Sequence, residues 1–215
     1  MSQNEQNSAV RIIDDISNAS FEEFIDCLFV HKLSDWVNFN PLRTINFYIR
    51  LFNDSTILFG KFSREQLEGG FWTIQSPALD LSMGYLIGDP NIPLELRLAC
   101  IKTTYDLFKD FFSVDILVNS GSMWWDCVLD TYKSKFRQGI VNDSEDGIIR
   151  STIFETLSQM LKLASLDCQG AALHGLGHLH HPDTEQVIMT YLETHPELDE
   201  EMQDFALDCI TGDIM

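Results

Sequence analysis

Apolar side chains recur every three or four residues along most of the chain, which is the period of an amphipathic α-helix. The clearest stripe runs from Pro93 to Phe112 and includes Leu98, Ile101 and Tyr105. The same spacing predicts further helices over about 10–18, 20–29, 41–52, 122–137 and 148–164. The pattern therefore predicts an all-α fold.

Two of these helices have recognisable first turns. Ser20 and Glu23 match a capping box, in which each side chain accepts a hydrogen bond from a backbone N–H at the start of the helix. Pro41 suits the first turn of the next helix, because a proline there sacrifices no backbone hydrogen bond. Both signals predict where a helix begins in the N-terminal part of the chain.

The segment 59–93 breaks the helical pattern. Glycine and proline residues recur through it and separate short apolar pieces such as Phe71–Ile74. Such residues mark turns and loops, so we expect an irregular connection here, with a short strand as an open alternative.

The C-terminal part carries three further stripes at helical spacing. A tight turn formed by His181, Pro182 and Asp183 separates the first stripe from the second, and His195 with Pro196 ends the second. Short helices joined by so small a turn cannot bury both faces alone, so they must stack on neighbouring helices. The stripes consist of Cys168, Ala172, Leu173, Leu176 and Leu179, then Val187, Ile188, Tyr191 and Leu192, then Met202, Phe205, Ala206, Cys209 and Ile210.

The stretch AALHGLGHLHHPD, residues 171–183, resembles the first helix and turn of a HEAT-like helical repeat. The resemblance covers about 165–212, and Gly177 is the position where it implies a close approach of the partner helix. It implies an irregular helical N-terminal part continued by HEAT-like antiparallel helix pairs in an α-α superhelix. HEAT-like arrays in general are protein-binding scaffolds, although a fold alone cannot name the ligand.

Composition limits the class of protein. With 215 residues and 45% hydrophobic content, the chain is long enough to form a single domain over 1–215. The 33 acidic and 14 basic residues give a formal net charge of −19, which repels a phosphate backbone, so we expect no nucleic-acid binding.

Localisation and redox state follow from the same composition. The first twenty residues lack the basic start and apolar stretch of a secretion signal, and no apolar run approaches the roughly 18 residues of a membrane span. The five cysteines are far apart and match no metal or redox motif. We therefore expect a cytoplasmic protein with reduced cysteines and no membrane contact.

Charge is unevenly distributed along the chain. No lysine or arginine follows Lys162, whereas acidic residues continue to the end. One interpretation is a solvated outer surface. The other is a docking surface for a basic protein, for example a toxin that this chain neutralises as an immunity-like partner. The interface candidates are Asp183, Glu185, Glu193, Glu197, Glu200 and Glu201.

Trp124 and Trp125 are adjacent, so on a helix they point about 100° apart. Tryptophan is frequent in binding hot spots, which makes both residues interface candidates, one of them exposed. The alternative is that both are wedged between neighbouring helices.

The sharpest chemical hint is the pair His174 and His178, one helical turn apart, which could bind one metal ion. A third ligand would come from His181, Asp183 or a distant residue. The leucine stripe instead predicts ordinary histidines that face away from the core. No phosphate loop, serine elbow or Cys-His signature occurs, so we expect neither catalysis nor a cofactor. A metal-binding protein or metal-dependent enzyme that uses His174 and His178 stays the alternative.

Overall fold

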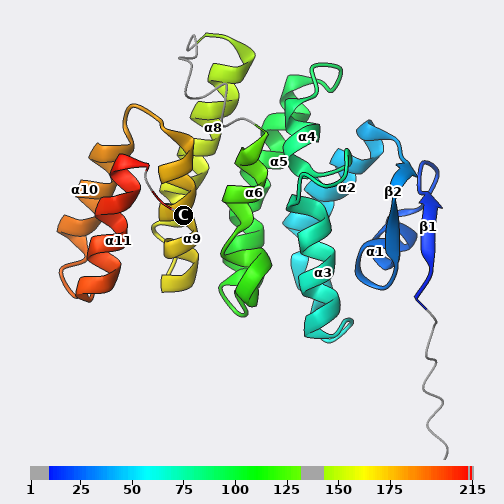
Figure 1. Cartoon of the computed structure of the whole chain (residues 1–215), viewed down its shortest axis with the longest axis horizontal. Coiled ribbons are helices and arrows are strands. Elements are labelled where there is room, and N and C mark those ends of the chain that lie inside the picture. Colours follow the sequence, from blue (N-terminus) through cyan, green and yellow to red (C-terminus); the bar gives the residue numbers. More distant parts are fainter. Residues whose placement is uncertain (1–9, 132–142, 213, 215) are drawn as a thin grey trace, which may run out of the picture.

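The computed structural model describes residues 10–131, 143–212 and 214, and most of them are helical (Figure 1). A small sheet of β1 and β2 lies at one end of the array, and the α10–α11 pair lies at the other. In chain order the elements are β1 (Ile12–Asp15), α1 (Phe21–Phe29), β2 (Lys32–Asn38), α2 (Pro41–Asn53), the 3₁₀-helix η1 (Ser55–Leu58), α3 (Arg64–Gln75), α4 (Met83–Gly88), α5 (Leu94–Leu107), the π-helices η2 (Phe108–Phe112) and η3 (Leu117–Gly121), α6 (Trp124–Asp130), α8 (Glu145–Met160), α9 (Leu166–Leu179), α10 (Thr184–Thr194) and α11 (Glu200–Thr211).

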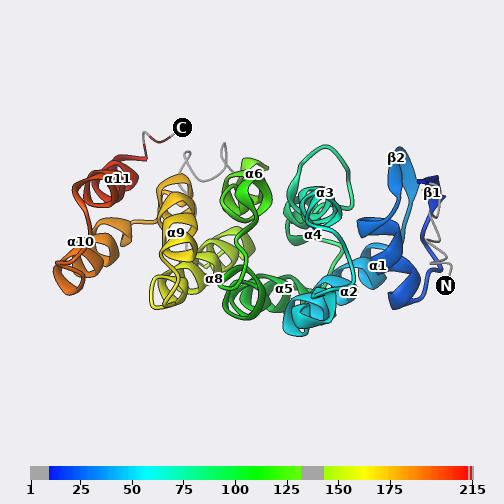
Figure 2. The ribbon, with the colours of Figure 1, turned by 90° about the horizontal axis from the view of Figure 1, so that it is seen from below.

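The helices lie side by side in two rows, which Figure 2 shows from below. In one row α2 contacts α5, and α5 contacts α8. In the other row α3 contacts α6, α6 contacts α9, and α9 contacts α11. The α8–α9 and α10–α11 contacts join the rows, so the C-terminal stripes do form helices that stack on their neighbours.

The core between the rows is rich in aromatic side chains. Trp124 lies at its centre, with ring centroids 5.6 Å from Phe52, 6.2 Å from Phe71 and 6.0 Å from Phe112. These side chains come from α2, α3, η2 and α6, and each is at most 1% exposed. Burial of so much apolar surface is the main contribution that holds the rows together.

Several predicted helix starts are confirmed. Ser20 and Glu23 form both hydrogen bonds of the capping box, at 3.3 and 2.8 Å. Pro41 is the first residue of α2, and the Asn40 side chain accepts a hydrogen bond from the Arg43 N–H. The predicted 93–112 helix appears as α5 continued by η2.

The predicted helix over 10–18 is wrong. Residues Ile12–Asp15 form β1, which pairs in parallel with β2, and Ile13 lies opposite Leu33. Isoleucines are β-branched and suit a strand, and the short segment finds a strand partner about twenty residues away in the sequence. The chain is therefore mostly helical with a small sheet rather than all-α.

The segment 59–93 is also more regular than expected. It contains α3 and α4, and Phe71–Ile74 lies within α3 rather than in a strand. A capping box of Ser63 and Gln66 begins α3. A Cβ on Gly70 would lie 2.1 Å from Phe29 Cδ1, so this mid-helix glycine allows α1 and α3 to pack closely.

Two remaining helix predictions are partly tested. The 122–137 helix appears as Trp124–Asp130, and its last predicted turns lie outside the described residues. The helix predicted from Ile148 begins earlier, at Glu145, because the Ser144 side chain accepts a hydrogen bond from the Gly147 N–H. None of the helices in the described part has the length and apolar content required to cross a membrane.

Candidate functional site

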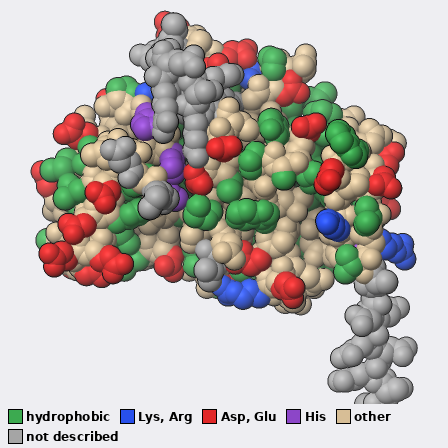
Figure 3. All heavy atoms as spheres, viewed as in Figure 1, with side chains coloured by type: hydrophobic (Ala, Val, Ile, Leu, Met, Phe, Trp, Pro, Cys, Tyr) green, Lys and Arg blue, Asp and Glu red, His purple; other side chains and the backbone are tan. Residues whose placement is uncertain are grey.

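The six predicted interface carboxylates are all exposed and lie on α10, on α11 and in the segments that adjoin them. We call the surface that they form the acidic end. Acidic side chains dominate the end of the molecule that α10 and α11 build, as the space-filling view shows (Figure 3). Its members are Asp183, Glu185, Glu193, Glu197, Glu200 and Glu201, together with the exposed Asp199, Asp204 and Asp208.

Helical spacing arranges these carboxylates in stripes around exposed apolar side chains. On α10, Glu185, Met189 and Glu193 follow one another at intervals of four residues, so they share one face. On α11, Asp204 lies three residues before Leu207 and belongs to its face. Met189 is 42% exposed and Leu207 is 46% exposed, although both are apolar. Each outward stripe therefore combines an apolar centre with flanking negative charge.

Few positive groups balance the acidic end. Five lysine and arginine side chains in the described ranges, Arg50, Lys61, Arg64, Arg97 and Lys109, pair with carboxylates elsewhere. At the acidic end, the close partner among described residues is His181, whose Nδ1 lies 3.8 Å from an Asp183 oxygen. Burial lowers the pKa of His181, and Arg150 lowers it further, so this imidazole is mainly neutral at pH 7. The negative charge therefore remains largely uncompensated.

The two candidate metal ligands occupy the interior rather than the surface. His174 is 7% exposed and His178 is 8% exposed, so the prediction that both face away from the core is wrong. The reason is the position of α9, which contacts α6, α8, α10 and α11 and is thus covered on all sides. A leucine stripe marks one buried face of a helix but does not show whether the opposite face is covered as well.

The rings of this histidine pair meet through their Nε2 atoms, which are 3.0 Å apart. The same Nε2 of His178 lies 3.1 Å from Asp126 Oδ1 on α6. A neutral imidazole carries one proton, so His178 Nε2 cannot both accept from His174 and donate to Asp126. With its proton on Nε2, His178 can donate to the Asp126 carboxylate and to His174 Nε2, and a cation between the rings is another arrangement that suits closely spaced lone pairs.

Metal coordination requires more than two side chains. Within the described ranges, no group of three or more His, Cys, Asp or Glu side chains is arranged to hold a metal ion. His181 is stacked on Phe154, with ring centroids 4.0 Å apart, and Asp183 is exposed. The structure therefore brings His174, His178 and Asp126 together, but it does not add the third ligands that the sequence analysis considered.

The two tryptophans are core residues. Trp124 is 0% exposed and Trp125 is 1% exposed, so the prediction that one of them faces a partner is corrected. Trp125 packs against α9, because a Cβ on Gly175 would lie 2.8 Å from Trp125 Cβ. Both indoles are wedged between helices, since α6 has α3 and α4 on one side and α9 on the other.

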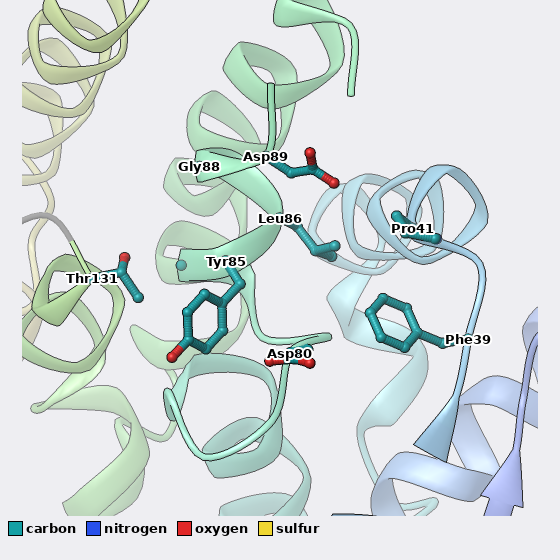
Figure 4. Close-up of a pocket in the computed structure, with 9 residues that line it drawn as sticks. Phe39, Pro41, Asp80, Tyr85, Leu86, Gly88, Asp89 and Thr131 are labelled. Carbon is teal, nitrogen blue, oxygen red and sulfur yellow. The ribbon is translucent and has the colours of Figure 1, made fainter. Parts of the chain in front are cut away.

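A cavity that no sequence pattern predicted lies between the segment before α2, the segment before α4, α4 itself and the end of α6. It has a volume of about 420 Å³, within the range of roughly 300–1,000 Å³ typical of small-ligand sites. Figure 4 shows the Asp80 and Asp89 side chains on opposite sides of Leu86, with the Tyr85 ring on one flank and the Phe39 ring on the other. We call this the Tyr85 cavity.

No local sequence signal marks the Tyr85 cavity, because its lining residues range from Phe39 to Thr131 in the sequence. The described residues that line it are Phe39, Pro41, Asp80, Gly84, Tyr85, Leu86, Gly88, Asp89 and Thr131.

No family model, curated protein or solved structure matches this chain.

Proposed function

We propose that this chain is a non-enzymatic protein-binding scaffold of HEAT-like helix pairs that recognises a basic protein through its acidic end. The observation that carries the proposal is the pair of outward stripes on α10 and α11. In these stripes exposed Met189 and Leu207 stand beside Glu185, Glu193 and Asp204, which form no ion pair with other described residues. Protein interfaces commonly combine an apolar centre with a polar rim, and complementary charge accelerates the encounter of the partners.

The arrangement of the helices supports the HEAT-like part of the proposal. Two rows, α2–α5–α8 and α3–α6–α9–α11, are what stacked antiparallel helix pairs produce. The predicted role of Gly177 is supported too, because a Cβ there would lie 3.1 Å from the Cys209 carbonyl oxygen on α11. A cationic toxin that this chain neutralises fits both the charge and the size of the chain, and it is the partner class that we favour.

A charge-neutralising variant tests this proposal. We expect the combination Glu185→Gln, Glu193→Gln, Glu200→Gln and Asp204→Asn to weaken binding of the partner at least about tenfold, mainly through slower association, because the attracting field is lost. The partner is first captured from the source cell on the immobilised wild-type chain. Its association and dissociation rates are then measured at about 50 and 300 mM salt.

A matched control changes the same number of charges elsewhere. Asp14→Asn, Asp35→Asn, Glu65→Gln and Glu95→Gln alter exposed carboxylates that form no ion pair with other described residues. We expect this variant to retain most of the binding. Equal losses in the two variants, or a captured partner whose retention does not change with salt, would contradict recognition by the acidic end.

A metal-binding protein that uses His174 and His178 is the second candidate, and the 3.0 Å approach of their Nε2 atoms is the observation that favours it. Asp126 is the carboxylate closest to this pair among the interactions described above. If this chain binds a metal ion, a further ligand would complete the coordination sphere, because zinc in proteins is usually held by three or four side chains.

Elemental analysis decides between the two candidates. If the chain binds a metal ion through His174 and His178, protein purified without chelators contains about one zinc or other transition-metal ion per chain. The substitution His178→Gln should then remove this metal. His195→Gln, a change at the C-cap of α10 that leaves the pair intact, serves as the control. If wild-type protein purified at neutral pH held no stoichiometric metal, the metal-binding proposal would be contradicted. The scaffold proposal would be unaffected by that result.

A further inference from the structure

We propose that the Tyr85 cavity is a receptor for a single arginine side chain of a basic partner protein. The inference rests on the proposed function, because it takes a basic protein as the partner, but it concerns a different part of the molecule. The acidic end would supply long-range attraction, whereas the cavity would supply a specific contact for one residue.

The described residues that line the cavity include two carboxylates, Asp80 and Asp89, and no basic side chain. Asp80 is exposed and forms no hydrogen bond or ion pair with any described residue, and Asp89 forms no ion pair within the same ranges. One oxygen of Asp89 accepts hydrogen bonds from the Asn91 backbone and side chain, both at 2.9 Å. The other oxygen of Asp89 and both oxygens of Asp80 are available to a cation.

Arg43, a basic residue near the cavity in the sequence, is engaged elsewhere. Arg43 lies in the first turn of α2, two residues after Pro41, which lines the cavity. Its guanidinium donates a hydrogen bond to the Ala19 carbonyl oxygen and lies 5.4 Å from the Phe47 ring centroid. Among the described lining residues there is no lysine or arginine, so these side chains present no like charge to a cation.

Aromatic and apolar walls favour a guanidinium over a simple ammonium ion. Phe39 and Tyr85 flank the cavity from opposite sides, and Leu86, which is 2% exposed, lies between the carboxylates (Figure 4). A guanidinium is planar and weakly hydrated, so it can stack on an aromatic ring and donate to a carboxylate at the same time. A lysine ammonium is compact and strongly hydrated, and it would use the carboxylates but gain less from the rings.

Binding of a small arginine derivative tests the inference directly. N-acetyl-L-arginine N-methylamide carries one positive charge and resembles a residue within a chain. We expect it to bind in the millimolar range and to shift the amide resonances of residues around Tyr85 in a titration of ¹⁵N-labelled full-length protein. Asp80→Asn and Asp89→Asn should each weaken binding about tenfold, because each removes one charge-assisted hydrogen bond.

The variants are chosen to preserve the fold. Asparagine at position 89 keeps an oxygen that accepts from the Asn91 N–H, and Asp80 is exposed. Tyr85 is 42% exposed, so Tyr85→Ala removes one aromatic wall without opening the core, and we expect it to weaken binding of the arginine probe several-fold. Asp14→Asn and Glu65→Gln, exposed carboxylates outside both the cavity and the acidic end, are the matched controls and should leave the binding constant unchanged.

The inference is overturned if the shifts are spread over carboxylates throughout the surface, if Asp80→Asn and Asp89→Asn bind the probe like the wild type, or if N-acetyl-L-lysine N-methylamide binds equally well. Its failure is distinguishable from failure of the proposed function. A protein that binds its basic partner through the acidic end, but not the arginine probe, disproves only the cavity assignment. A protein that binds the probe at the cavity, but no basic partner, disproves the scaffold proposal.

Discussion

Replacing Trp124 with alanine is expected to lower the free energy of unfolding by about 3–5 kcal/mol, which is the usual cost of deleting a fully buried large aromatic side chain. The indole is 0% exposed and contacts rings from three other elements, including Phe52 on α2 and Phe71 on α3. Because these elements belong to both rows, the cavity left behind cannot collapse without moving a helix. Chemical denaturation followed by circular dichroism measures the change.

Trp36 provides the matched control for this prediction. It is the same residue type, but it lies on β2 with 91% of its side chain exposed. Trp36→Ala should change the free energy of unfolding by no more than about 0.5 kcal/mol, as surface substitutions usually do. If the two substitutions had similar effects, Trp124 would not occupy the centre of the core.

Gly175→Ala is expected to destabilise the protein by about 1–2 kcal/mol, although alanine is the better helix former. An added Cβ would lie 2.8 Å from Trp125 Cβ on α6 and 2.9 Å from Leu157 Cδ2 on α8. Overpacking of this kind costs roughly 1–3 kcal/mol, and the gain in helix propensity, about 1 kcal/mol, offsets only part of it. The shift in the midpoint of urea denaturation gives the sign.

Gly170→Ala in the same helix should have the opposite effect. The nearest atom to an added Cβ there is Met202 Cε at 3.9 Å, which is an ordinary contact. With no clash to overcome, the substitution should stabilise the protein by about 0.5–1 kcal/mol through helix propensity and the smaller entropy of the unfolded chain. A stabilising Gly175→Ala would show that α9 does not approach α6 and α8 as closely as described.

Local sequence signals predicted the elements that depend on local interactions. The three C-terminal helices follow from stripes of apolar residues, and they appear as α9, α10 and α11. The capping box of Ser20 and the proline at position 41 predicted the starts of α1 and α2 correctly. A cap satisfies backbone N–H groups within one turn, so it acts regardless of what the rest of the chain does.

Predictions failed where a distant segment decides the structure. Residues Ile12–Asp15 form a strand because β2 is beside them, and Gly70 is tolerated within α3 because the Phe29 ring occupies the space of its missing side chain. The capping box of Ser63 and Gln66 was a signal that could have identified α3.

For the candidate sites, composition and helical spacing alone account for the excess of carboxylates after Lys162 and for their stripes on α10 and α11. Packing between distant segments buries His174, His178 and both adjacent tryptophans, and it places Asp80, Tyr85 and Asp89 in one cavity with Phe39. The physical reason is that helical periodicity records which side chains share a face, whereas burial depends on how many neighbouring helices cover that face.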